Sequence, residues 1–167
     1  MLSLNDWKYG SDFTATGTNL DTQQPEGELT IYANGLQVGD AAQTTLRLAA
    51  NYMPVKGLKI YASYFFADRL FAAYDVNDTQ FLSAGGVIAE LPSYGLLDAG
   101  VFYNFEVSGL KMTLGANVNN LLDTEYISEL ITNKVDDPAT TNRNEFYDNI
   151  GWYGFGRTWN TSLKVNF

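Results

Sequence analysis

The sequence of 167 residues lacks cysteine and histidine, and only 17% of its residues are charged. These absences exclude disulfides, thiolate and imidazole metal ligands, cysteine nucleophiles and histidine acid–base catalysis. Basic residues are also scarce: 10 stand against 19 acidic residues, which gives a net charge of −9. Because nucleic-acid binding requires a basic surface, we expect no nucleic-acid partner.

Long hydrophobic runs are missing too. The longest uncharged runs, such as residues 29–39 and 112–122, have 11 residues. A transmembrane helix needs ~18 residues, whereas a transmembrane β-strand needs only ~9–11. A helical membrane protein is therefore excluded and a membrane barrel is not. Residues 1–9 contain no basic segment followed by an apolar core, so we expect no signal peptide there.

The sequence is rich in aromatic residues and in alternating patterns. Aromatic residues make up 14% of the chain, with 11 Tyr, 10 Phe and 3 Trp. Apolar and polar side chains alternate with the period of a β-strand in segments 46–52, 58–66, 97–105, 110–119 and 157–167. Segments 2–16 and 28–38 alternate less cleanly and are also predicted as strands. The sequence thus predicts an all-β, antiparallel fold of about seven strands without a helix.

Three properties of these strands favour a transmembrane β-barrel over a soluble β-sandwich. The predicted strands have ~10 residues instead of the usual ~5–6. Aromatic residues gather at strand ends, as in the aromatic girdles of membrane barrels; they include Tyr52, Phe65, Phe66, Tyr103, Phe105, Trp159 and Phe167. The polar side of the strands carries charges in mid-strand, which suits a water-filled lumen: Arg47, Lys59, Asp98, Lys111 and Lys164.

Short and long connections alternate along the chain. Residues 53–57 and 106–109 read as tight turns, whereas 68–94 and 120–156 are long connections. Membrane barrels have short periplasmic turns and long external loops. We therefore expect both tight turns and the C-terminus at Phe167 on the periplasmic side, and segment 17–27 on that side as well.

Several segments resemble the C-terminal barrel of TonB-dependent outer-membrane receptors of the Bacteroidetes type. The sequence Asn-Leu-Leu-Asp-Thr-Glu-Tyr at 120–126 is similar to the end of their penultimate strand, and residues 153–167 are similar to their last strand. Segments 38–45, 92–98 and 103–105 also resemble that group, in the same order. The resemblance covers nearly the whole chain.

The resemblance implies a partial barrel: residues 1–167 supply about seven strands of a barrel of ~22 strands, without the plug domain. It implies a receptor of the Gram-negative outer membrane, in contact with lipid, with the rest of the barrel and plug, and through the plug with TonB. The imported nutrient remains open among siderophores, glycans, peptides and cobalamin. Within the last strand, the resemblance implies a recognition signal for the barrel-assembly machinery, carried by Trp159, Leu163, Val165 and Phe167.

Other candidate sites are weaker. Carboxylates at Glu129, Asp136, Asp137, Glu145 and Asp148 could bind Ca²⁺, but the spacing of an EF-hand is absent, which favours a solvated acidic loop. The aromatic residues Trp152, Tyr153 and Phe155 are either a stacking platform for a ligand or part of an outer aromatic girdle.

No catalytic motif is present, so we expect neither enzyme activity nor a cofactor or metal. Segment 64–74 could line a vestibule on the external side. Two further functions remain open: a small closed barrel with a structural or passive-pore role, and a soluble carbohydrate-binding sandwich. The small barrel needs an eighth strand from 125–131 or 81–89.

Overall fold

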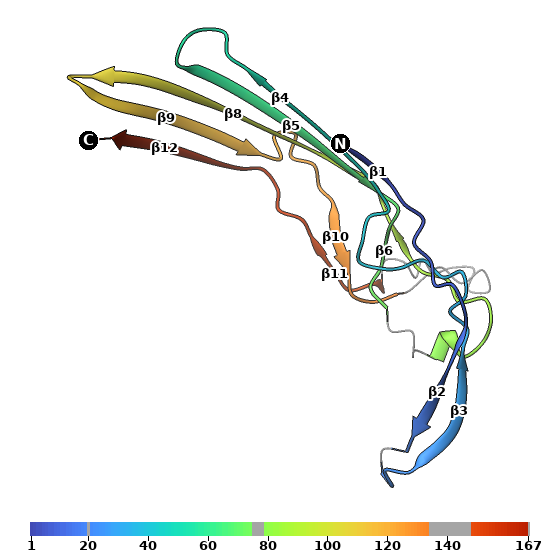
Figure 1. Cartoon of the computed structure of the whole chain (residues 1–167). Helices are drawn as coiled ribbons and strands as arrows, with labels where there is room; N and C mark the ends of the chain where they lie inside the picture. Colours follow the sequence, from blue (N-terminus) through green and yellow to red (C-terminus); the bar gives the residue numbers. More distant parts are fainter. Residues whose placement is uncertain (20, 75–78, 134–147, 167) are drawn as a thin grey trace.

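The computed structural model describes residues 1–19, 21–74, 79–133 and 148–166. Six strands form one antiparallel sheet (Figure 1). From one edge to the other, the order is β1 (Leu2–Leu4), β4 (Thr44–Tyr52), β5 (Leu58–Asp68), β8 (Tyr94–Val107), β9 (Leu110–Asn119) and β12 (Thr158–Asn166). Every neighbouring pair is antiparallel, so the predicted all-β, antiparallel class is confirmed.

The two ends of this sheet differ. At one end, here called the turn end, β4 connects to β5 through residues 53–57 and β8 connects to β9 through residues 108–109. The long connections leave from the opposite end, here called the loop end (Figure 1). They contain three two-stranded hairpins and a short 3₁₀ helix: β2 (Phe13–Thr18) with β3 (Pro25–Ile31), β6 (Leu70–Phe71) with β7 (Glu90–Leu91), β10 (Ile127–Leu130) with β11 (Gly151–Tyr153), and η1 (Thr79–Phe81).

The strand predictions for the first 38 residues are confirmed only in part, because the two segments contain β1, most of β2 and part of β3. Segments 2–16 and 28–38 are not two long strands of the main sheet, because only β1 joins it and pairs directly with β4. The hairpin β2–β3 belongs to the connection between β1 and β4, which leaves from the loop end (Figure 1). The described residues of segment 17–27 therefore lie at the loop end, not beside the tight turns. The irregular alternation of these segments has a physical reason, since only residues 2–4, 13–16 and 28–31 of them belong to strands.

The register confirms the alternation predicted for the five other segments. In an antiparallel pair, directly opposed residues point to the same face of the sheet. Rows of opposed residues consequently run across the strands. One row contains Ala50, Ala62, Ala99, Val118 and Trp159, and the next contains Tyr52, Ile60, Val101, Ala116 and Thr161. Phe167 lies outside the described residues.

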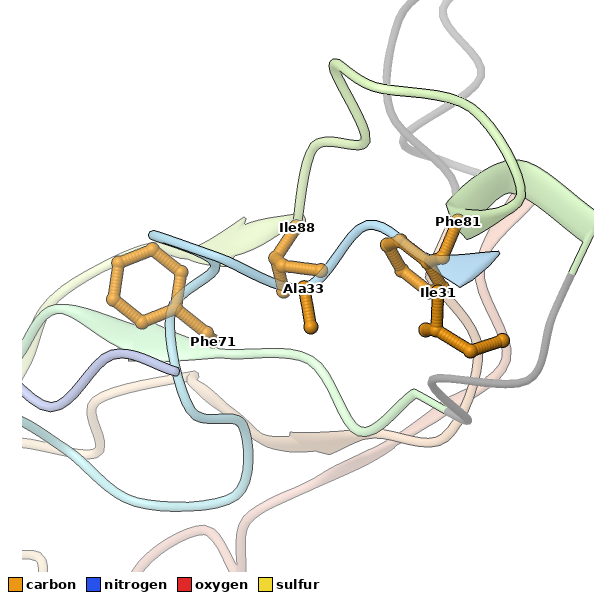
Figure 2. Packing of buried hydrophobic residues seen from close by; sticks show 5 residues of the cluster. All are labelled: Ile31, Ala33, Phe71, Phe81 and Ile88. Carbon is orange, nitrogen blue, oxygen red and sulfur yellow. The ribbon is translucent and has the colours of Figure 1, made fainter. Parts of the chain in front are cut away.

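The buried core lies at the loop end and not on the sheet. Figure 2 shows its main cluster, in which Phe81 of η1 lies next to Ile31 of β3, and Ile88 lies next to Ala33. Phe71 completes this cluster, and the backbone amide of Tyr32 donates a hydrogen bond to the Phe81 carbonyl at 2.8 Å. A second cluster joins two of the long connections, the one between β5 and β8 and the one between β9 and β12; its members are Ala72, Ala89, Leu91 and Leu130.

The middle of the six-stranded sheet has no second layer against it in the part of the chain described. Leu48, Leu114 and Leu163 are 56%, 51% and 58% exposed, whereas a sandwich buries one face of each sheet. The sheet is also open, since β1 and β12 form its edges. Of the two segments considered for an eighth strand, 125–131 supplies β10, which pairs with β11, and 81–89 contains no strand. No helix in the described residues is long and apolar enough to cross a membrane.

Candidate functional site

One face of the six-stranded sheet is almost entirely apolar. This apolar face comprises Leu46, Leu48, Ala50 and Tyr52 of β4 and the residues in register with them on the other strands. Its only polar exceptions within the six strands are Thr44, Thr161 and Asp68. Asp68 lies at the last position of β5, at the loop end. A continuous apolar surface of this kind marks a site of contact with a partner or a membrane.

Aromatic residues lie toward the two ends of the apolar face. Tyr52, Tyr103 and Phe105 lie toward the turn end, and the rings of Tyr103 and Phe105 stack with centroids 5.6 Å apart. Tyr64, Phe66 and Trp159 lie toward the loop end. Apart from Trp159 and Tyr52, the two central rows of the face carry alanine and β-branched residues.

The opposite face is polar, and its side chains form hydrogen bonds across strands. The Tyr61 hydroxyl donates to Asn117 Oδ1 at 3.1 Å, and Asn117 Nδ2 donates to Asn160 Oδ1 at 3.1 Å. The Thr113 hydroxyl donates to Asn104 Oδ1 at 2.7 Å. All charged residues of the six strands except Asp68 lie on this face: Arg47, Lys59, Asp98, Glu106, Lys111 and Lys164. The predicted division into an apolar side and a charged side is confirmed.

Two glycines on the polar face make room for aromatic rings of the neighbouring strands. Tyr61 is directly opposite Gly100, and Phe102 is directly opposite Gly115. A Cβ atom at Gly115 would lie 2.9 Å from the Phe102 ring, and one at Gly100 would collide with Tyr61. The two rings stack with centroids 6.0 Å apart. Glycine in mid-strand ordinarily weakens a sheet, and an aromatic ring across from it restores the packing.

The segment 120–126 forms a hydrogen-bonded connection between β9 and β12. Asn120 is buried and has φ of 49°, a left-handed conformation that asparagine tolerates better than most residues. Its side chain accepts a hydrogen bond from the Thr124 amide at 2.9 Å and donates to the carbonyls of Thr124 and Phe155 at 2.9 and 3.3 Å. Asp98 accepts a hydrogen bond from the Asn120 amide at 2.9 Å.

Asp123 and Tyr126 complete this connection. Asp123 Oδ1 accepts a hydrogen bond from the Arg157 amide at 2.8 Å, and its Oδ2 lies 3.3 Å from the Arg157 guanidinium. The ring of Tyr126 stacks on Tyr94 of β8, with centroids 4.3 Å apart, and lies against Gly154. We call Asn120, Asp123, Tyr126 and Arg157 the β9–β12 joint. The residues that carry the family resemblance thus have structural partners, a role that the sequence analysis did not identify.

A second polar connection attaches the segment after β1 to the sheet. Gln43 is fully buried; it donates to the Trp7 carbonyl at 3.1 Å and accepts from the Trp7 amide at 2.9 Å. Arg69 donates to Asp6 at 2.7 Å, and Lys8 donates to Asp6 at 2.9 Å. These hydrogen bonds from Lys8 and Arg69 lower the pKa of the Asp6 carboxyl. The sequence analysis missed this connection because its residues are far apart in the chain.

Three of the four residues assigned to the barrel-assembly signal lie on one face of an edge strand. Trp159, Leu163 and Val165 all belong to the apolar face of β12. Trp159 is 74% exposed, and β12 pairs on one side only, with β9. Phe167 lies outside the described residues. An apolar stripe on an open strand edge is a surface that another strand or a lipid can cover.

The three loop aromatics Trp152, Tyr153 and Phe155 are among the most exposed large side chains, at 63%, 77% and 88%. Their backbone is held in place, since the Trp152 carbonyl accepts a hydrogen bond from the Ser128 hydroxyl at 2.9 Å. Their rings therefore project from an ordered part of the loop end. This position suits both a stacking platform and an aromatic girdle.

The remaining candidate residues divide among different environments. Of the acidic residues considered for Ca²⁺, Glu129 is exposed on β10 and Asp148 is half-buried, while Asp136, Asp137 and Glu145 lie outside the described residues. Within the described residues, no three His, Cys, Asp or Glu side chains are arranged to hold a metal ion.

The aromatic segment 64–74 does not form one surface. Tyr64 and Phe66 belong to the apolar face, whereas Phe71 is part of the buried core. The Tyr74 hydroxyl donates to the Gln37 carbonyl at 2.6 Å, and burial, with a smaller effect of Tyr9, raises the pKa of Tyr74 to about 12. The segment therefore contributes to several parts of the loop end and not to a single vestibule wall.

In sequence comparisons the chain matches no protein family and no curated protein.

Proposed function

We propose that the six-stranded sheet is part of the wall of a β-barrel in the outer membrane of a Gram-negative bacterium. The apolar face contacts lipid, and the polar face lines an aqueous lumen. The observation that carries this proposal is the separation of the two faces: an exposed apolar face on one side, and every strand charge but Asp68 on the other. In water, an exposed apolar surface of this extent promotes aggregation.

The open edges support a wall segment of a larger barrel. Within a bilayer every backbone amide and carbonyl must be paired, so membrane sheets close on themselves. Both β1 and β12 are edge strands in the described part of the chain. In this proposal, additional strands pair with both edges and complete the barrel.

The resemblance at 120–126 and 153–167 leads us to propose a TonB-dependent receptor, with this chain forming the C-terminal portion of its barrel. In support, segment 120–126 directly follows β9, and β12 is the next strand of the main sheet. The short turns lie at one end of the sheet and the long connections at the other (Figure 1), as periplasmic turns and external loops do in barrels.

In the complete receptor, the external loops capture a scarce nutrient, and TonB drives its uptake through the plug domain. The nutrient class is left open among siderophores, glycans, peptides and cobalamin. The C-terminus is periplasmic, the protein has no enzyme activity, and its assembly machinery recognises Trp159, Leu163, Val165 and Phe167.

Bilayer contact of the apolar face can be tested by tryptophan quenching. The chain has 3 tryptophans, Trp7, Trp152 and Trp159, and only Trp159 belongs to the apolar face of the sheet. The chain is reconstituted into vesicles whose acyl chains are brominated, and its fluorescence is compared with that of Trp159→Phe and Trp7→Phe. We expect quenching to fall in Trp159→Phe and to persist in Trp7→Phe. A chain that is monomeric, cooperatively folded and soluble without detergent would contradict the proposal.

A further inference from the structure

Lysine residues are concentrated at the turn end of the polar face, although the chain has a net charge of −9. Lys59, Lys164 and Lys111 lie in three successive rows of that face, and Lys56 lies in the adjoining turn. The one carboxylate in these rows is Glu106, opposite Lys111. None of the four lysines forms a salt bridge with any residue that the structure describes. We call these four residues the lysine patch.

A groove lies beside the lysine patch. It has a volume of about 650 Å³, and polar side chains of β8, β9 and β12 contribute much of its lining. The lining residues used in this argument are Lys56, Asn104, Lys111, Thr113 and Asn166. The Asn104 and Thr113 side chains hydrogen-bond to each other. The groove therefore combines two lysines and one carboxylate, Glu106, with amide and hydroxyl groups, which can hydrogen-bond to a peptide backbone.

We infer that the lysine patch docks an acidic polypeptide segment supplied by another domain or another chain. With Glu106 as the one carboxylate in these rows, the four lysines leave an excess of positive charge. Like charges repel one another, and a carboxylate-rich partner reduces that repulsion. Lys59 and Lys111 are two strands and two rows apart, which corresponds to about 17 Å with strand spacings of ~4.8 Å and a rise of ~3.3 Å per residue. An extended peptide of about five residues spans that distance.

The choice of a polypeptide over a lipid rests on the proposed function. A bilayer that covers the apolar face lies on the other side of the sheet from Lys59, Lys111 and Lys164. Anionic headgroups therefore do not reach these three ammonium groups. A nucleic acid is disfavoured by the net charge of −9, because its phosphates would be repelled by the protein as a whole.

The test uses the full chain in zwitterionic detergent micelles and a fluorescein-labelled hexaglutamate peptide, with fluorescence anisotropy at low salt as the readout. A hexaglutamine peptide is the neutral control. The double variant Lys111→Gln/Lys164→Gln is compared with Lys8→Gln/Arg47→Gln, which removes the same charge elsewhere. We expect the first variant to lose affinity for hexaglutamate by about tenfold and the second by less than about twofold. Lys111→Arg/Lys164→Arg should retain binding.

Two results would overturn the inference. One is equal affinity for the hexaglutamate and hexaglutamine peptides, and the other is an equal loss of affinity for hexaglutamate in the two charge-matched double variants. Binding of phosphatidylglycerol vesicles, but not of hexaglutamate, would overturn it in favour of lipid. Circular dichroism checks that both variants keep their strand content. The tryptophan quenching experiment is independent of this one, since it reports on the opposite face and does not involve the lysines. The two proposals can therefore fail separately.

Discussion

The carboxylate of Asp123 accepts a hydrogen bond from the backbone amide of Arg157, at 2.8 Å, just before β12 begins. The same carboxylate lies 3.3 Å from the Arg157 guanidinium. Asp123, in the connection that follows β9, thus orients the backbone just before β12. Both side chains are about half exposed, so the ion pair adds little stability and the hydrogen bond to the backbone matters more.

Replacing Asp123 tests the β9–β12 joint. In Asp123→Ala the Arg157 amide loses its acceptor, and alanine is strained at the φ of 56° found here. We expect a loss of about 2 kcal/mol in the free energy of unfolding. Asp123→Asn keeps an acceptor and should lose less than about 1 kcal/mol. Urea unfolding in lipid vesicles measures the free energies of unfolding of both variants. Glu125→Ala serves as an exposed neighbouring control. If Asp123→Ala is as stable as the parent chain, Asp123 does not stabilise the β9–β12 joint.

The ring of Tyr61 over Gly100 provides a second test. In Gly100→Ala the new methyl group meets both the Tyr61 ring and the Asn117 side chain, and we expect a destabilisation of about 1–3 kcal/mol. Adding Tyr61→Ser should recover part of this loss, because it removes the ring. Gly10→Ala is the control, since nothing lies within 4 Å of a Cβ atom there. The free energies of unfolding of the two single variants and the double variant are measured by urea unfolding. If the effects of Gly100→Ala and Tyr61→Ser simply add, the new methyl group does not clash with the Tyr61 ring.

Adjacent residues on opposite faces of β9 distinguish a membrane environment from water. In lipid, Leu114→Lys places a charge among acyl chains and should destabilise the reconstituted protein by about 2–4 kcal/mol. Thr113→Lys, one residue away on the polar face, loses the hydrogen bond to Asn104 and lies opposite Lys164, and it should cost only about 1 kcal/mol because its ammonium group stays in water. In water, Leu114→Lys would not be the more destabilising of the two substitutions, because Leu114 is already 51% exposed and a lysine there would be tolerated. Equal effects of the two substitutions in vesicles would count against the lipid-facing assignment.

Tyr74 predicts a dependence of stability on alkaline pH. Burial raises its pKa from 10.0 to about 12, so the folded state keeps the hydroxyl proton to higher pH than the unfolded chain does. The stabilisation from the protonated form is complete below pH 10 and is lost as the pH rises through 12. We therefore expect the stability difference between the parent chain and Tyr74→Phe to shrink between these pH values. Phe155→Leu, which removes no ionisable group at a residue 88% exposed, is the control for a change in an aromatic side chain.

The strands that form most of the main sheet could be predicted from the sequence. In β9 and β12 alternation continues over the whole strand, and a period of two assigns each side chain to a face without knowledge of its neighbours. The positions of the charges Lys59, Lys111 and Lys164 on one common face followed from the same rule. Tight turns were also predicted at 53–57 and 106–109 from their proline and glycine residues. In the structure the second turn is confined to 108–109, and Gly57 and Gly109 adopt positive φ.

Only the tertiary structure revealed the path of residues 5–43, the roles of Asn120 and Asp123, and the lysine patch. A local hairpin and a wall strand have the same alternation, so β2 and β3 could not be assigned to either from their residues alone. Asn120 hydrogen-bonds to Phe155, 35 residues away, and Asp123 hydrogen-bonds to Arg157, 34 residues away. The sequence by itself therefore determined which face each side chain occupies, because alternation is local. Which strands are neighbours, and which side chains meet, depended on register, which is set by contacts between distant segments.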